Sequence, residues 1–110
     1  MTRADDKRLD DIVEVAAIVA RGRAAFDSDI ALRRAVERCL EIIGEASKAL
    51  SDEVRAAISE VPWREIIRLR DRVSHHYHRI EPDVLWVTAE EEVPQLVGAV
   101  LAWRQQDRQS

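Results

Sequence analysis

The feature that most constrains this chain is an apolar pattern that repeats in alternating steps of four and three. The residues that carry it are Leu32, Val36, Cys39, Ile43, Ala46 and Leu50. Steps of three and four return to one face of an α-helix, whereas a strand requires a period of two. Further apolar residues, Ala35, Leu40 and Ile42, widen the stripe. We therefore expect a helix at the centre of the fold that packs against two neighbours.

The same periodicity predicts a chain built from helices alone. Besides the central helix, we expect long helices over residues 5–21, over residues 62–78 and from residue 83 onward, with a short helix over 52–58. Only three glycines and three prolines interrupt the 110 residues, so turns are few and connections short. The sequence predicts a single domain over residues 1–110. Its fold class is all-α, an antiparallel up-down bundle of four long helices and one short helix.

Polar and conformationally special residues mark the expected helix ends. Gly22 ends the first helix or follows its end closely. Asp27 and Ser28 are suitable N-caps for the central helix, and Ser51 is a suitable N-cap for the short one. Pro94 lies inside the last helix, where its ring and missing N–H are expected to kink the helix or split it in two.

Several classes of protein are excluded by composition. No apolar run approaches the roughly 20 residues that span a bilayer, and the N-terminus is too acidic and polar for a signal peptide. The single cysteine, Cys39, cannot form an internal disulfide, and its place on the apolar stripe predicts a small buried side chain. We therefore expect a cytoplasmic protein that neither spans a membrane nor is secreted.

Positive charge is concentrated in one segment of an acidic chain. The whole chain has 17 Lys and Arg residues against 21 Asp and Glu residues, a formal charge of −4. Residues 62–80 hold five arginines and two acidic residues, so this segment carries +3 and the remainder −7. All three histidines and the only tyrosine lie in the same segment, as His75, His76, His78 and Tyr77. If the chain has a functional site, we expect it here.

Arg70 and His75 are the residues of this segment best suited to catalysis. An imidazole that titrates near neutrality can act as general acid or base, and a guanidinium can bind a phosphate through two hydrogen bonds. Asp71 precedes His75 by four residues, where its carboxylate can orient the ring. The set suits metal-free RNA cleavage, in which a 2′-OH attacks its own phosphodiester. Because Arg70 and His75 lie about 140° apart around an ideal helix, we expect a two-fold dimer to bring them together.

Less specific interpretations remain open for the same residues. The other arginines suit a solvated helix face, and a histidine on a helix is more often structural than catalytic. Tyr77 continues the apolar row formed by Ile66, Leu69 and Val73, and in this interpretation it is a half-buried side chain. Asp71, His75 and His78 share a face and could hold a metal, but no fourth protein ligand with suitable spacing is visible. We expect neither a metal nor a cofactor.

Three residues of the central helix bear on how the basic segment is packed. Gly44 lies among larger residues, where a missing side chain permits close approach of another helix. Glu41 and Glu45 are either solvated charges or partners for arginines of the basic segment. The sequence does not decide between these alternatives.

Three motifs occur along the chain: RCLEIIGEASK at 38–48, VPWREI at 61–66 and RDRVSHHY at 70–77. Together they resemble the HepT-like family, which comprises HEPN-superfamily toxins of bacteria and archaea. The resemblance extends from about Arg8 to Trp103, with the motifs in the family's order and spacing. It implies a HEPN-like helical bundle that dimerises. It also implies a metal-independent endoribonuclease whose Arg and His line a cleft between two protomers.

Carried onto this sequence, the resemblance implies a role for each residue of the RxxxxHxY motif. Arg70 and His75 would be catalytic, and Tyr77 would accept AMP from ATP. The enzyme that transfers the AMP would be a minimal nucleotidyltransferase, the antitoxin partner in a type VII-like toxin–antitoxin system. Asp71 stands where the family commonly has Asn; it keeps a polar contact to His75 but adds negative charge near the phosphate. Further candidate contacts to the RNA substrate are Arg68, Arg72 and His76.

A second class of function remains open beside the nuclease. The chain could be a catalytically silent HEPN module that docks a nucleotidyltransferase and helps it bind its nucleotide or substrate. The net negative charge slightly favours this alternative, because nonspecific RNA affinity grows with the number of phosphates neutralised. The intact set of Arg70, His75 and Tyr77 favours the nuclease.

Overall fold

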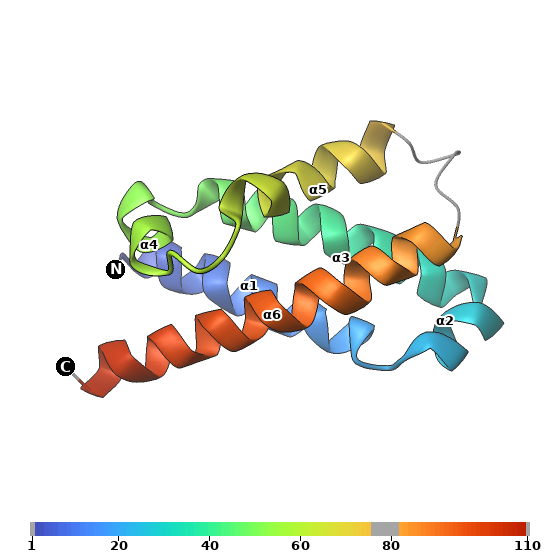
Figure 1. The fold of residues 1–110 in the computed structure, drawn as a ribbon, viewed down its shortest axis with the longest axis horizontal. Helices are drawn as coiled ribbons and strands as arrows, with labels where there is room; N and C mark the ends of the chain where they lie inside the picture. Colours follow the sequence, from blue (N-terminus) through green and yellow to red (C-terminus); the bar gives the residue numbers. More distant parts are fainter. Residues whose placement is uncertain (1, 76–81, 110) are drawn as a thin grey trace.

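The computed structural model describes residues 2–75 and 82–109, and within these ranges the chain is helical and contains no strand (Figure 1). Successive long helices run in opposite directions, so the predicted all-α antiparallel bundle is confirmed. No helix in the described ranges is long and apolar enough to cross a membrane. In chain order the helices are α1 (Arg3–Val19), α2 (Arg23–Ser28), α3 (Ile30–Ala49), α4 (Asp52–Ala57), α5 (Trp63–His75) and α6 (Pro82–Gln109).

Helix α3 is the central element of the bundle. It packs against α1 on one side and against α5 on the other, as its wide apolar stripe predicts (Figure 1). All six residues of the four-and-three pattern are buried, none more than 6% exposed. Cys39 is among them: burial raises the pKa of its thiol, and its Sγ lies 3.3 Å from the carbonyl oxygen of Val15. The prediction of a small buried side chain is confirmed.

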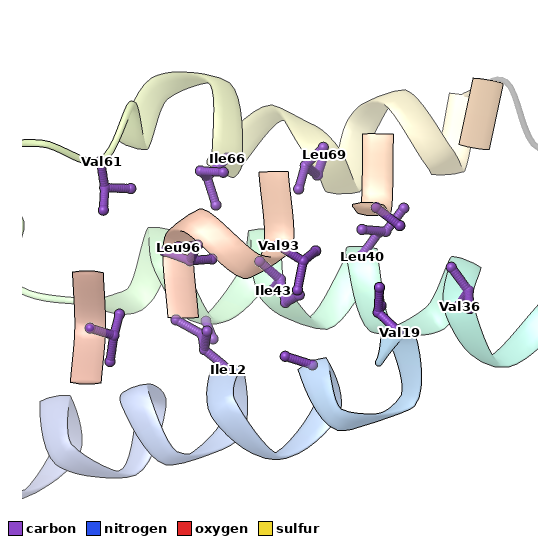
Figure 2. Close-up of a cluster of buried hydrophobic side chains, with 14 of the residues drawn as sticks. Ile12, Val19, Val36, Leu40, Ile43, Val61, Ile66, Leu69, Val93 and Leu96 are labelled. Carbon is purple, nitrogen blue, oxygen red and sulfur yellow. The ribbon is translucent and has the colours of Figure 1, made fainter. Parts of the chain in front are cut away.

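The core lies between α3 and the helices around it. Apolar side chains of α1, α3, α5 and α6 meet in one continuous cluster (Figure 2). Fully burying one such side chain contributes about 1.5–3 kcal/mol, which makes this cluster the main source of stability. The members labelled in Figure 2 are Ile12, Val19, Val36, Leu40, Ile43, Val61, Ile66, Leu69, Val93 and Leu96.

The short helix α2 is an element that the sequence pattern missed. The described residues therefore form four long helices and two short ones, not one. Asp27 and Ser28 lie inside α2, so the prediction that they cap α3 is wrong; Asp29 is the N-cap, and its side chain accepts a hydrogen bond from the Ala31 N–H at 2.9 Å. Phe26 anchors α2 by packing fully buried against Trp86 of α6, with ring centroids 5.2 Å apart.

Helix α6 passes through Pro94 as one element of 28 residues. Of the two outcomes predicted for Pro94, a kink or a split, the split is therefore wrong. Pro94 is exposed, so the backbone carbonyl that loses its N–H partner lies on the side of the helix that water can reach. On the opposite side, Ala89, Val93 and Leu96 are buried in the core and hold the two halves of the helix to the bundle.

Two polar clusters join α1 to other helices through its N-terminal half. The buried carboxylate of Asp5 accepts hydrogen bonds from the Ser51 N–H at 2.8 Å and the Ser51 hydroxyl at 2.9 Å, which ties the start of α1 to the start of α4. These bonds, led by the one from the Ser51 N–H, lower the pKa of Asp5. Arg104 of α6 is 8% exposed and pairs with Asp6 at 2.8 Å and Asp10 at 2.9 Å.

Candidate active site

Helices α3 and α5 approach most tightly where Gly44 faces Arg70. A Cβ atom on Gly44 would lie 2.9 Å from the backbone nitrogen of Arg70 and 3.2 Å from the carbonyl oxygen of Ile67. Real Cβ atoms are essentially never found at the shorter of these distances, so only glycine fits without moving α5. The predicted role of Gly44 in close helix packing is confirmed, and its partner is the backbone of Arg70.

The side chain of Arg70 is paired with the residue that follows this glycine. Its Nε lies 3.1 Å from Oε1 of Glu45, and the two side chains are 52% and 42% exposed. Glu41, one turn earlier on α3, instead pairs within its own helix with Arg38 at 3.6 Å. The sequence did not decide whether Glu41 and Glu45 are solvated or pair with arginines of the basic segment. In the structure Glu45 pairs with such an arginine, and Glu41 pairs with Arg38 of its own helix.

The other predicted site residues fall along α5 and beyond its end. Asp71 is exposed, and α5 ends at His75, so the two residues are one helical turn apart on the same element. That Asp71 orients the ring of His75 stays a prediction. His76, Tyr77 and His78 lie outside the described residues, and their assigned roles stay predictions as well.

Arg68 and Arg72 occupy different electrostatic surroundings on α5. Arg68 is exposed and lies 3.7 Å from Glu65, a pair within one helix that contributes little in water. Arg72 is also exposed and acts on Glu92 of α6, where its positive charge opposes a rise in the pKa of that carboxyl. Both side chains are accessible to an RNA substrate, as candidate contacts must be.

Glu92 is a charged group that the sequence pattern gave no reason to single out. It is partly buried on α6, and desolvation raises its pKa above the ordinary 4.5. Its Oε2 is buried and has no hydrogen-bond partner among the described residues. It lines a cavity of about 280 Å³ with Val61, Pro62 and Ile66. In the sequence it is the last of three consecutive glutamates, which is typical of a solvated helix face.

Metal binding finds no support among the described residues. Within residues 2–75 and 82–109 there is no group of three His, Cys, Asp or Glu side chains that could hold an ion. The alternative set of Asp71, His75 and His78 includes a residue outside these ranges, so the structure does not test it.

A groove of about 590 Å³ between α1 and α6 lies away from Arg70. Its lining is mostly small or apolar and includes Ala17, Trp86 and Val97. Its one acidic residue, Glu90, accepts a hydrogen bond from Trp86 Nε1 at 3.1 Å. The lining formed by the described residues contains no histidine, lysine or arginine that could bind a phosphate or supply an imidazole, so α5 remains the element that carries the candidate active site.

Comparison with known proteins points to one family. Residues 8–102 match the family described as Ribonuclease HepT-like. The chain is 37% identical over 103 residues to "Probable ribonuclease HepT" of Thermococcus cleftensis, a match that covers 89% of this chain and 94% of that protein. No solved structure matches the chain.

Two further curated relatives match a shorter stretch. A "Putative RNase" of Caldanaerobacter subterraneus subsp. tengcongensis is 45% identical over 71 residues, and one of Methanocaldococcus jannaschii is 35% identical over 71 residues. Each match covers 64% of this chain, and it spans 63% and 59% of the length of the respective relative.

Proposed function

Because the chain belongs to the Ribonuclease HepT-like family, we propose that it is a metal-independent endoribonuclease whose active site contains Arg70 and His75. The observation that carries the proposal is the placement of Arg70. Its backbone is packed against Gly44, while its guanidinium is half exposed at the surface of the one strongly basic segment. An arginine whose backbone is held in place and whose guanidinium is half exposed is suited to bind a phosphate of RNA.

The proposed reaction is an internal transfer at phosphorus. The 2′-oxygen of a ribose attacks the adjacent phosphodiester and loses its proton to a general base, and the 5′-oxygen of the next nucleotide leaves with a proton from a general acid. His75 supplies acid–base catalysis, typically worth 10²–10⁴-fold in rate. Arg70 stabilises the negative charge that develops on the phosphoryl oxygens. Asp71 orients the imidazole, and Arg68, Arg72 and His76 contact neighbouring phosphates.

A complete site requires two copies of the chain. On one helix Arg70 and His75 are separated by about 140°, so they project from different faces. In a two-fold dimer that apposes the α5 helices, Arg70 of one protomer meets His75 of its partner, and two such pairs supply an acid, a base and phosphate ligands. We expect a dimer at micromolar concentration in light scattering; a strict monomer that still cleaves RNA would refute this arrangement.

Cleavage of labelled RNA in the presence of a chelator tests the proposed activity. We expect cleavage by the wild type with excess EDTA, and a loss of at least about 10²-fold in His75→Ala and Arg70→Ala. Arg64→Ala is the matched control, because it also removes one exposed positive charge from α5. Cleavage that disappears with EDTA would indicate a metal enzyme. Absence of any cleavage would favour the silent binding module.

Control of the nuclease is proposed to act through Tyr77. A minimal nucleotidyltransferase antitoxin would direct the Tyr77 hydroxyl onto the α-phosphorus of ATP, which forms a Tyr–AMP phosphodiester and releases pyrophosphate. The added negative charge and nucleotide would occupy the place of the substrate phosphate, and could pair with Arg70. The position of Tyr77 seven residues after Arg70, on the same face of an ideal helix, supports this proposal.

Intact-mass measurement tests the modification separately from catalysis. After incubation with the antitoxin and ATP, we expect AMP additions on the wild type and none on Tyr77→Phe, which lacks only the acceptor oxygen. Tyr77→Phe is expected to keep at least part of the RNA cleavage. The same mass gain on Tyr77→Phe as on the wild type would show that another residue is modified.

A further inference from the structure

Two consecutive residues of α3 act on the same residue of α5. Gly44 sets how closely the backbone of Arg70 can approach α3, since a Cβ there would lie 2.9 Å from the Arg70 nitrogen and 3.1 Å from its Cβ. Glu45 then contacts the side chain of that residue, with its Oε1 3.1 Å from Nε. Residues of α3 thus contact both the backbone and the guanidinium of Arg70.

The contact is made at the inner end of the guanidinium. Nε is the nitrogen attached to the aliphatic stem, and the two terminal Nη groups lie beyond it. Among the described residues, Glu45 is the ion-pair partner of Arg70, and the contact is made at Nε. A guanidinium offers donors along more than one edge, so a carboxylate at Nε leaves the terminal edge available to a phosphate.

The pair is placed to orient a side chain rather than to stabilise the fold. Both partners are about half exposed, and exposed ion pairs contribute little to stability. An unpaired arginine samples many rotamers, and ordering it on substrate binding costs conformational entropy. A partner on a neighbouring helix that restricts those rotamers beforehand reduces this cost at the moment of reaction.

We propose that Glu45 is a positioning residue for Arg70: its carboxylate holds the inner end of the guanidinium so that the terminal edge meets the scissile phosphate. The inference rests on the proposed nuclease function, and it assigns to the conspicuous IIGEA segment a role in the site. Glu45 acts through Arg70 and touches no reacting atom. Its negative charge disfavours RNA binding in general, so its effect is expected in the chemical step and not in affinity.

The first test compares Glu45→Ala with Glu41→Ala in steady-state RNA cleavage with EDTA. Glu41 is the matched control, because it lies one turn away on α3 and pairs with Arg38 instead. We expect kcat to fall about tenfold in Glu45→Ala with KM unchanged or lower, since misplacing a binding group mainly affects the transition state. Glu41→Ala should stay within about twofold of the wild type. In an Arg70→Ala background, Glu45→Ala should cause no further loss.

The second test observes the ion pair without RNA. The order parameter of the Arg70 Nε–Hε group, measured by 15N NMR relaxation, should be higher in the wild type and Glu41→Ala than in Glu45→Ala. Equal order parameters in all three, or an unchanged or increased kcat in Glu45→Ala, would overturn the positioning role. A wild type that shows the Glu45-dependent ordering but cleaves no RNA would refute the proposed nuclease and leave Glu45 as the residue that fixes Arg70.

Discussion

Replacing Gly44 by alanine perturbs the packing that places Arg70. The new Cβ would lie 2.9 Å from the Arg70 nitrogen, 3.1 Å from the Arg70 Cβ and 3.2 Å from the Ile67 carbonyl oxygen. Two of these atoms belong to the backbone and the third is fixed to it, so relief requires α5 to move away from α3. Overpacking of this kind costs about 1–3 kcal/mol. Alanine in place of glycine within a helix returns about 0.5–1 kcal/mol. We expect a net loss of about 1 kcal/mol in the free energy of unfolding.

Gly98 provides the control for this substitution. It lies inside α6, and a Cβ added there would meet nothing within 4 Å. Gly98→Ala should therefore stabilise the protein by about 0.5–1 kcal/mol, which leaves a difference of roughly 1–3 kcal/mol between the two variants. Urea denaturation followed by circular dichroism measures both, at one fixed protein concentration because a dimer would make stability depend on concentration.

The same pair of variants connects packing to function. Gly44→Ala shifts the backbone of Arg70, so RNA cleavage should fall, whereas Gly98→Ala should leave cleavage unchanged. If Gly44→Ala proved as stable as Gly98→Ala, the close contact between α3 and α5 would not be the reason for glycine at this position, and the reasoning would be refuted.

Three other side chains carry predictions of their own. Asp5→Ala removes the acceptor for two hydrogen bonds from Ser51, so it should lower the free energy of unfolding, measured by thermal unfolding, by about 1–3 kcal/mol. Because folding lowers the pKa of Asp5, the wild type should lose this stability as the pH falls below the ordinary pKa of 3.8. Desolvation raises the pKa of Glu92, so wild-type stability should decline through this group as the pH rises above 4.5. Glu92→Gln should therefore be more stable than the wild type at pH 7, and equal or lower stability at pH 7 would contradict this. Cys39 should react with a thiol reagent only after urea unfolding, and rapid reaction in the native protein would contradict its burial.

The long helices could be predicted because their burial follows a regular period. The stripe from Leu32 to Leu50 fixes both the helix and the need for two neighbours, and the structure supplies these as α1 and α5. Helix α2 could not be found in this way, since six residues are too few for a periodic signal and its anchor is a contact of Phe26 with Trp86, sixty residues away. The split of the last helix at Pro94 was wrongly predicted, because the effect of a proline depends on which side of the helix faces water.

The candidate site was only partly accessible from the sequence. The separation of Arg70 and His75 around α5, on which the proposed dimer rests, follows from helix geometry alone. The choice between Glu41 and Glu45 does not, because both lie on one face of α3 and the crossing of α3 with α5 decides which of them meets Arg70. Glu92 is similar: three consecutive glutamates predict solvation, and only the packed bundle shows that one of them is partly buried.

The central claim is that Arg70 and His75 of two protomers form one RNA-cleaving site, and mixing the wild type with an inactive variant tests it most directly. A dimer of the wild type with His75→Ala keeps one histidine, so it lacks either the acid or the base. Random exchange between equal amounts of the two leaves about a quarter of all dimers wild type, which predicts about half of the cleavage rate in EDTA that the same amount of wild type gives alone. A cleavage rate that the added His75→Ala leaves unchanged would contradict the claim.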